Sequence, residues 1–207
     1  MALRVLGRVT SINVRKVLWA ADEMDLSYER EDWGLPLRDP NEPEFLALNP
    51  NALVPVIIED DFVLWESHAI INYLSTTNGG ALLPQQPRER AIVDQWLGWQ
   101  TSDLNVTWGY AFMGLARRAP AFMVPDRIAD SIQRWSAKMA VLEQRLTQTD
   151  GFVAGDTFTL ADIAIGLSVH RWFGTPMERP ETPAVAAYYA RLRSRPAGAR
   201  WMTAEVP

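Results

Sequence analysis

The stretch NPNALVPVIIEDDFVLWES, residues 49–67, contains a strand pattern that a proline interrupts. Residues 54–58 form a short apolar run rich in β-branched side chains, which predicts a buried strand. Pro55 lies within that run, yet it has no N–H to donate, which normally confines proline to sheet edges and bulges. Three acidic residues then predict a tight turn, and residues 62–65 predict a strand that returns beside the first. The pattern therefore indicates a hairpin with a proline in its first strand.

Glu66 and Ser67 come directly after this hairpin and open an apolar-periodic helix. Taken alone, they are typical of a solvated acid and an ordinary N-cap. Beside a proline-interrupted strand, an acid and a hydroxyl at a helix start also suggest a site for an extended polar ligand. The residues themselves leave both interpretations open.

The residues before the hairpin predict two more strands. Residues 3–6 form a short apolar run that ends at a glycine, and residues 27–32 indicate a second strand after an intervening helix. A strand-helix-strand order favours a parallel pair, whereas the tight turn at residues 59–61 requires an antiparallel pair. A short helix is expected near residues 44–48. A mixed four-stranded sheet with helices on its faces satisfies both conditions, so an α/β, thioredoxin-like arrangement is predicted.

The first predicted helix has two candidate N-caps, Ser11 and Asn13. Each side chain can accept a hydrogen bond from the free amides of the first helical turn. A hydroxyl at a helix N-terminus also lies where anions are stabilised. From these residues alone, capping is the simpler interpretation.

Strand patterns end near residue 80, and the remainder predicts an all-α bundle. The proline-containing segment 81–87 is the expected linker between an N-terminal domain, residues 1–80, and a helical domain, residues 88–207. An apolar seam with spacings of three and four residues is expected at Ile128, Ile132, Trp135, Met139, Leu142 and Leu146. A second apolar stripe is expected at Ile92, Trp96, Trp99, Val106, Tyr110 and Met113. Thr159 and Asp162 predict a capping box at the start of a further helix.

The composition is ordinary for a soluble globular protein, with 48% hydrophobic and 22% charged residues among 207. A formal net charge of −5, without a run of Lys or Arg, argues against nucleic-acid binding. No span has the length and apolarity of a membrane helix or a secretion signal, so a cytoplasmic protein that does not bind membranes is expected. The chain has no cysteine, which excludes disulfides, zinc–thiolate sites and a protein thiol nucleophile. His68 and His170 show no metal-ligand spacing, so no metal is expected and both are interpreted as structural or surface residues.

Several short motifs occur together along the chain. They are Ser11-x-Asn13-x-Arg15-Lys16-Val17-Leu18, Asn49-Pro50, Val54-Pro55, Glu66-Ser67-x-Ala69-Ile70 and Thr159-x-x-Asp162. In this combination the sequence resembles the cytosolic glutathione transferases, in particular their bacterial, theta-like members. The resemblance covers essentially the whole chain. It implies a thioredoxin-like domain followed by a helical domain, glutathione as co-substrate, and a homodimer.

The resemblance also implies how glutathione is bound. Pro55 is expected to be cis, which leaves the backbone of Val54 to pair with the cysteinyl part of glutathione like an added strand. Glu66 is expected to bind the γ-glutamyl ammonium, and Ser67 with the helix amides its carboxylate.

Ser11 matches the position of the catalytic serine of theta-like members. A hydroxyl that donates to the glutathione sulfur stabilises the thiolate, which is the nucleophile. Asn13 stands where many relatives have proline, and its amide is a second candidate donor. Leu53 stands where many relatives have a lysine that contacts the glycyl carboxylate. Arg38 is the candidate that supplies this charge instead.

The activity that the resemblance implies is thiolate attack on small apolar electrophiles in detoxification, with dehalogenation or peroxide reduction as further activities open to the same thiolate. The electrophile is expected against aromatic and methionine side chains, at Trp108, Phe112 and Met113, with Trp172 and Phe173 as further candidates. The alternative is a non-catalytic glutathione-transferase-like module for binding or protein interaction. Leu53 keeps that alternative open, whereas Ser11, Glu66 and Ser67 count against it.

Overall fold

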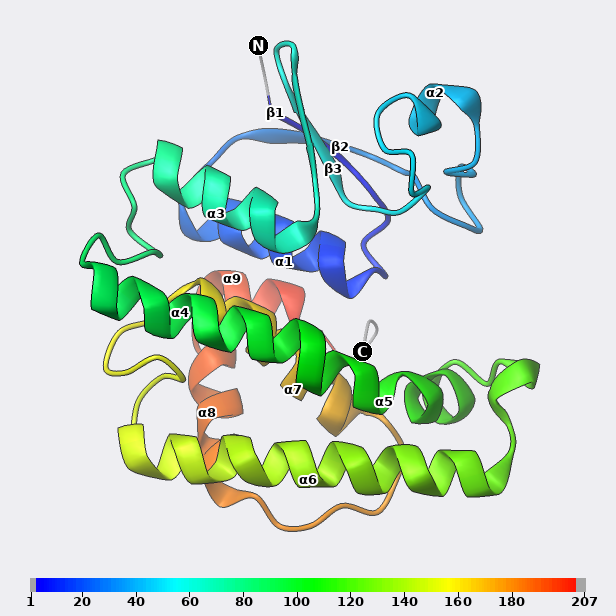
Figure 1. Ribbon diagram of the computed structural model, residues 1–207, viewed down its shortest axis with the longest axis vertical. Helices are drawn as coiled ribbons and strands as arrows, with labels where there is room; N and C mark the ends of the chain where they lie inside the picture. Colours follow the sequence, from blue (N-terminus) through cyan, green and yellow to red (C-terminus); the bar gives the residue numbers. More distant parts are fainter. Residues whose placement is uncertain (1–2, 204–207) are drawn as a thin grey trace. The chain divides into compact units, whose positions relative to one another are not determined.

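The computed structural model of the protein describes residues 3–203 and has two compact units (Figure 1). The first unit runs to Leu83 and contains all the strands found among the described residues, and the second begins at Pro84 and is helical. An α/β unit followed by an all-α unit is the fold class that the sequence predicts. No helix within residues 3–203 is both long and apolar enough to cross a bilayer.

The first unit contains a four-stranded mixed sheet with the strand order β2-β1-β3-β4. Its strands are β1 (Leu3–Leu6), β2 (Tyr28–Glu31), β3 (Val56–Glu59) and β4 (Phe62–Trp65). β1 pairs parallel with β2 and antiparallel with β3, and β3 pairs antiparallel with β4. The predicted mixed sheet is therefore confirmed, because a helical crossover joins the parallel pair and a tight turn joins the antiparallel pair.

The strand predicted over residues 54–58 begins later than expected. β3 starts at Val56, and Pro55 lies just before it. Val56 pairs with Leu6 on one side and with Trp65 on the other. A central strand uses its N–H groups on both sides, and proline has none, so Pro55 can only precede the ladder.

Three helices accompany the sheet in the first unit. They are α1 (Ile12–Glu23), α2 (Pro43–Leu46) and α3 (Ser67–Thr77). α1 and α3 pack against each other and lie side by side on one face of the sheet (Figure 1). The helix expected near residues 44–48 is a single turn, because the proline at the first position of α2 favours a start there and the chain turns again at Asn49.

The sheet buries apolar side chains on both faces. Leu6 and Val56, neighbours on adjacent strands, cluster with Trp33 and with Phe45 of α2. Because side chains alternate along a strand, the next residues on β1 and β3 face the opposite side, where α1 and α3 lie. This two-sided core fixes the ends of β1 and β3, and residues 8–10, shortly after β1, and Val54, shortly before β3, are partly exposed.

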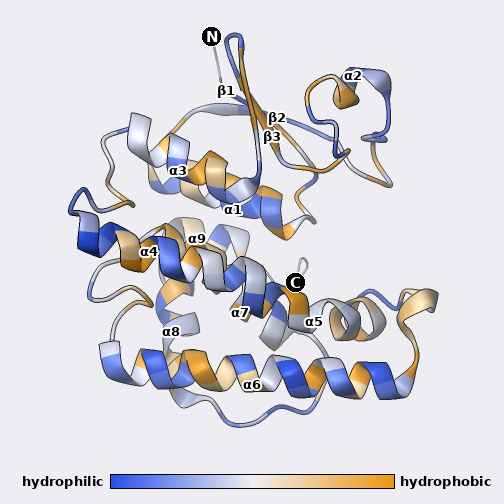
Figure 2. Cartoon of the chain, in the orientation of Figure 1, coloured by the Kyte–Doolittle hydropathy of each residue, from blue (hydrophilic) through white to orange (hydrophobic). Residues whose placement is uncertain are grey.

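The second unit consists of helices and helical turns. They are α4 (Pro87–Trp99), the π-helical turn η1 (Gln100–Leu104), α5 (Asn105–Ala111), the π-helical turn η2 (Phe112–Ala116), the 3₁₀ turn η3 (Pro120–Phe122), α6 (Pro125–Thr149), α7 (Leu160–Gly174), α8 (Pro183–Arg193) and α9 (Pro196–Trp201). Along α6, hydrophobic and hydrophilic residues alternate in short steps (Figure 2). The predicted seam faces the core: Trp135, Met139, Leu142 and Leu146 are buried, and Ile128 and Ile132 partly so.

The stripe predicted from Ile92 to Met113 is only partly buried. Ile92 is 38% exposed and Val106 59%, whereas Val93 and Trp108 are buried. The predicted stripe assumes an α-helix with about 3.6 residues per turn from Ile92 to Met113. The turns η1 and η2 hydrogen-bond from residue i to residue i+5, which rotates the buried face relative to that period.

Asp162 closes the predicted capping box at the start of α7, and the box is confirmed. Its carboxylate accepts hydrogen bonds from the Thr159 backbone amide at 2.8 Å, the Val153 amide at 2.8 Å and the Tyr188 hydroxyl at 2.9 Å. Burial raises the pKa of Asp162 to about 6. The residue thus joins the loop before α7, the helix itself and α8 through one buried carboxyl group.

Candidate active site

Ser11 is the N-cap of α1. Its Oγ accepts a hydrogen bond from the Val14 amide at 3.5 Å, which is long for such a bond. The hydroxyl proton is not used in this contact, and within residues 3–203 the Ser11 hydroxyl donates no hydrogen bond. The Ser11 side chain is partly exposed. It can therefore cap the helix and still donate its proton to a ligand.

Asn13 lies in the first turn of α1 and is also partly exposed. Of the two residues predicted as candidate caps, the structure uses Ser11. The Asn13 side chain makes no hydrogen bond within the described part of the chain, so its amide also remains available to a ligand.

Gly7, at the end of β1, brings the start of α1 close to the segment before β3. A Cβ atom on Gly7 would lie 2.4 Å from Cγ2 of Val14 and 3.2 Å from Cβ of Val54. Its φ of +155° is also one that side-chain-bearing residues rarely adopt. Glycine is thus needed for the first turn of α1 and Val54 to approach each other. Sequence reasoning missed this role, although a glycine directly after a predicted strand was a usable signal.

Val54 lies outside the sheet ladder, and the Val54–Pro55 peptide bond is cis, as the family resemblance implies. Within residues 3–203, neither the N–H nor the C=O of Val54 has a backbone hydrogen-bond partner. The loop before it is held by the buried Asn49, whose side chain donates to the Leu53 carbonyl at 2.8 Å and accepts from the Asn51 amide at 3.0 Å. The backbone of Val54 is therefore presented by a fixed loop with both polar groups available.

Glu66 is the residue before α3, and its backbone has a φ of 74°. Such a conformation is unfavourable for a residue with a side chain, and it is often kept at binding sites. The exposed Glu66 carboxylate has no hydrogen-bond or ion-pair partner in the part of the chain that the structure describes. Ser67, buried at the first position of α3, likewise makes no side-chain hydrogen bond there. An acid and a hydroxyl thus flank the free amides of a helix start, which attract anions.

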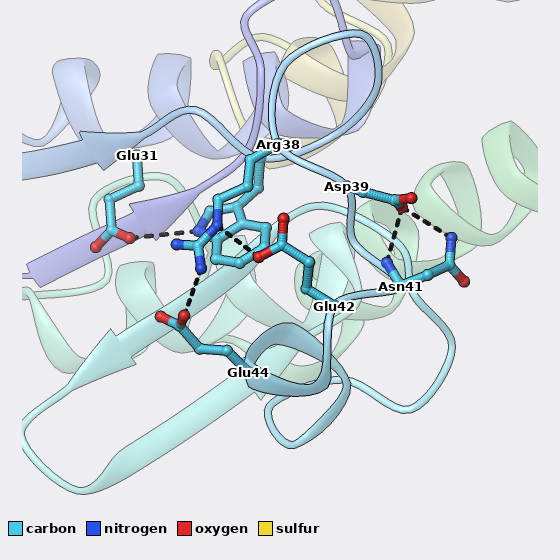
Figure 3. Close-up of polar contacts among 7 residues, drawn as sticks. Glu31, Arg38, Asp39, Asn41, Glu42 and Glu44 are labelled. Atoms are coloured by element: carbon cyan, nitrogen blue, oxygen red, sulfur yellow. Dashed lines mark hydrogen bonds and ion pairs between the residues drawn. The ribbon is translucent and has the colours of Figure 1, made fainter.

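Arg38 lies in the loop after β2 and is engaged by acidic neighbours (Figure 3). Its Nε donates to Glu42 at 2.9 Å, and its Nη2 pairs with Glu44. Its guanidinium also lies 3.7 Å from the ring centre of Trp33. The hydrogen bond to Glu44 raises the pKa of Arg38. A ligand carboxylate at Arg38 would therefore compete with two protein carboxylates.

Leu53, at the position where the family resemblance implies a lysine, is 64% exposed. Its side chain offers no charge to a ligand. The assignment of Arg38 to the glycyl carboxylate stays a prediction, and the Arg38 guanidinium is already paired with Glu42 and Glu44.

Trp108, Phe112 and Met113 lie on α5 and η2 of the second unit. Trp108 is 6% and Phe112 2% exposed, with the two rings 5.6 Å apart and nearly perpendicular. Met113 is partly exposed. The Arg171 guanidinium lies 4.7 Å from the Trp108 ring centre and 4.2 Å from that of Phe112. Of the three, Met113 offers the most side-chain surface.

The further aromatic candidates differ in burial. Trp172 is fully buried against Trp135, with ring centres 4.9 Å apart, so it belongs to the core. Phe173 is partly exposed and borders a groove of about 380 Å³ with Arg179, residues 180–183 and Ala186. In residues 3–203, no group of three or more His, Cys, Asp or Glu side chains is placed to hold a metal ion.

Comparisons with known proteins match both units. Residues 1–76 match the model of the glutathione S-transferase N-terminal domain, and residues 125–191 match that of the C-terminal domain. Glutathione S-transferase GstB of Escherichia coli K12 is 34% identical over 194 residues, which cover 92% of this chain and 93% of that protein. The disulfide-bond oxidoreductase YfcG of the same organism is 30% identical over 198 residues, covering 89% and 87%.

Solved structures give the same result. The theta class glutathione S-transferase of Xanthomonas axonopodis pv. citri, with glutathione bound, superposes with a TM-score of 0.93 at 38% identity, covering 98% of this chain and 97% of that one. The glutathione transferase F7 of Populus trichocarpa superposes with a TM-score of 0.83 at 25% identity, covering 98% and 100%. Both units, the full length and the fold thus agree, and this chain belongs to the glutathione S-transferase family.

Proposed function

We propose that this protein is a glutathione transferase that activates bound glutathione as a thiolate for attack on small apolar electrophiles. The observation that carries the proposal is the Ser11 hydroxyl, which caps α1 only as an acceptor and retains its proton for a ligand. Membership of the family supports the same conclusion. Leu53, which offers no charge to the glycyl carboxylate, is the feature that keeps a non-catalytic module as the alternative.

Glutathione is assigned to the first unit. The N–H and C=O of Val54 pair with the cysteinyl residue of glutathione, as a strand pairs with a peptide. Glu66 binds the γ-glutamyl ammonium, and Ser67 with the first amides of α3 binds the γ-glutamyl carboxylate. Pro55 ends the ladder of β3 at this point, so that Val54 is free to pair. Arg38 is assigned to the glycyl carboxylate.

Activation of the thiol is assigned to Ser11. A free thiol has a pKa of about 8.5, so only a few per cent is ionised at neutral pH. A hydroxyl that donates to the sulfur, at the start of a helix, stabilises the thiolate and lowers that pKa. The thiolate then forms a carbon–sulfur bond with the electrophile while the leaving group departs with its electron pair. Asn13 is the second candidate donor.

The apolar electrophile is assigned to Trp108, Phe112 and Met113. Aromatic rings and a methionine side chain adapt to apolar molecules of different shape. The partly exposed Met113 is the residue through which such a molecule can be contacted first. Halide displacement and peroxide reduction use the same thiolate and remain within the proposal.

The test is direct. The purified protein is expected to bind glutathione in a calorimetric titration and to accelerate its reaction with a chlorodinitroarene. Binding without turnover on any electrophile in a screen would support a binding module instead. Absence of binding at millimolar glutathione would refute the proposed function.

We also propose a cytoplasmic homodimer with a role in detoxification, built from domains at residues 1–80 and 88–207 joined by residues 81–87. The absence of cysteine fits a reducing compartment. Light scattering is expected to give twice the 23.4 kDa mass of the chain. A mass of one chain at micromolar concentration would contradict the dimer.

A further inference from the structure

A hydrogen bond joins the two helices whose starts carry the proposed site. Nζ of Lys16 lies 3.1 Å from Nε2 of His68. Lys16 belongs to α1, whose N-cap is Ser11, and His68 is the second residue of α3, directly after Ser67. The contact is thus close in sequence both to the residue assigned to activation and to those assigned to the γ-glutamyl end.

The chemistry of the two side chains fixes the direction of this bond. A lysine ammonium has donor hydrogens and no acceptor, so Nε2 of His68 must accept. Lys16 is only 2% exposed, and a buried ammonium is tolerated when it is hydrogen-bonded. His68 therefore satisfies part of the requirement of a buried charge.

Helix packing alone leaves the relative position of α1 and α3 less well defined. α1 and α3 contact each other, and each helix buries apolar side chains, among them Val17 on α1 and Ile70 on α3, both fully buried. Burial of apolar surface is non-directional, whereas a hydrogen bond is confined to a narrow range of distance and angle. The Lys16–His68 bond can thus fix the register of the two helices.

We infer that Lys16 and His68 are positioning residues for glutathione. Their hydrogen bond holds the first turn of α3, with Glu66 and Ser67, at a defined place relative to the first turn of α1, with Ser11. The inference rests on the proposed function, in which glutathione extends from one helix start to the other. Binding of such a ligand depends on the spacing of the two ends of its site.

Lys16→Met tests this with a change of similar shape that removes the ammonium. The dissociation constant for glutathione, measured by calorimetry, and its KM are expected to rise about tenfold, as for loss of a hydrogen bond to a charged group. Turnover at saturating glutathione is expected to stay within about twofold, because Ser11 still meets the sulfur once glutathione is bound.

Two substitutions at His68 separate positioning from packing. His68→Leu removes the acceptor and is expected to match Lys16→Met. Gln can place its carbonyl oxygen near the position of Nε2, so His68→Gln is expected to stay close to the wild type. The double variant Lys16→Met/His68→Leu is expected to bind no more weakly than either single variant, since each single variant already breaks the bond between the two side chains.

A matched control is Lys138→Met. Lys138 donates to Asp103 at 2.6 Å in the second unit, so this variant also loses a lysine contact but leaves α1 and α3 intact. Its affinity for glutathione is expected to be unchanged. If Lys16→Met does not fold, the two His68 variants decide the question.

Two results refute the positioning role. Equal glutathione affinity in the wild type, Lys16→Met and His68→Leu shows that the bond does not position the site. Equal weakening by His68→Leu and His68→Gln shows that the imidazole acts through shape and not through its acceptor. If the wild type itself does not bind glutathione, the proposed function and this inference both fail. If the wild type binds glutathione and the variants bind it equally well, only the inference fails.

Discussion

Ser11 illustrates how one side chain can serve folding and chemistry at once. Its oxygen accepts from the Val14 amide, and its proton remains available. The two uses do not conflict, because a hydroxyl has one donor hydrogen and two acceptor lone pairs. Ser11→Ala therefore removes both the N-cap acceptor and the donor hydrogen. Loss of the cap is measured by stability, and loss of the donor by turnover, on the same protein.

Ser11→Ala is expected to lower turnover about ten- to hundredfold at pH 7, because the thiol pKa returns towards about 8.5. Glutathione affinity is expected to change far less, since the binding contacts are elsewhere. The rate should recover as pH is raised towards that pKa. Unchanged turnover would move the donor role to Asn13, and Asn13→Ala measured in parallel would show it.

Glu66→Gly is expected to act in opposite directions on stability and binding. Glycine adopts a φ of 74° without the cost that glutamate bears there, so the free energy of unfolding should rise by about 1 kcal/mol. Loss of the carboxylate should weaken glutathione binding about tenfold. Chemical denaturation and calorimetry measure the two quantities.

The control is Asp150→Gly, at the left-handed C-cap of α6, where φ is 48°. It is expected to stabilise the protein similarly without changing glutathione affinity. If Glu66→Gly leaves affinity intact, Glu66 does not bind the γ-glutamyl ammonium.

At the level of elements, the junction of β1 and α1 depends on the missing side chain of Gly7. Gly7→Ala places a methyl group 2.4 Å from Cγ2 of Val14. We expect a loss of about 1–3 kcal/mol in the free energy of unfolding, as for overpacking. Because Val54 is the other neighbour, glutathione affinity should fall as well. Thermal unfolding and calorimetry test both, and unchanged values for the two would show that the junction relaxes freely.

The start of α7 depends on Asp162, whose pKa burial raises from 3.8 to about 6. Between these values the folded protein holds more protons than the unfolded chain, so the contribution of Asp162 to stability is complete below pH 3.8 and is lost as pH rises through about 6. The loss is on the order of 3 kcal/mol. Asp162→Asn cannot titrate, so its stability should lack this fall.

Denaturant unfolding of the wild type and of Asp162→Asn between pH 4 and pH 7 gives the difference in their free energies of unfolding at each pH. The wild-type advantage over Asp162→Asn is expected to shrink as pH rises, because the ionised carboxyl group is the unfavourable form when buried. A constant difference over the range would show that the hydrogen bonds from Thr159, Val153 and Tyr188 offset the cost of burial.

For the whole molecule, glutathione binding is linked to stability, since a ligand that binds only the folded protein shifts the folding equilibrium. At a hundredfold excess over the dissociation constant the gain is about 2.7 kcal/mol. A rise in the thermal midpoint with glutathione is therefore expected for the wild type and for Ser11→Ala. Glu66→Gly, with its tenfold lower affinity, should gain only about 1.4 kcal/mol at the same glutathione concentration, about half the wild-type rise. If the thermal midpoint of Ser11→Ala did not rise with glutathione, Ser11 would contribute to glutathione binding and not to activation of the thiol.

Much of the fold followed from local patterns. The tight turn after β3, the crossover between β1 and β2, and the spacing along α6 each depend on neighbours in sequence, so each was predictable. The start of β3 and the buried face of the helices from α4 to η2 were predicted wrongly, because contacts with other parts of the chain or breaks in the helical period overrode the local pattern. Pro55 could not lie inside a central strand, and the turns η1 and η2 changed the buried face of a helix that a uniform period described poorly.

The sequence by itself determined the class of each unit, the capping box at Asp162 and the residue types around the Val54–Pro55 motif, because these depend on composition and short spacing. Only the tertiary structure decided that Gly7 brings Val14 to Val54, and that the buried Lys16 meets His68. Those contacts join residues far apart in the chain. Their distances are set by how the sheet and its helices pack, which no local pattern records.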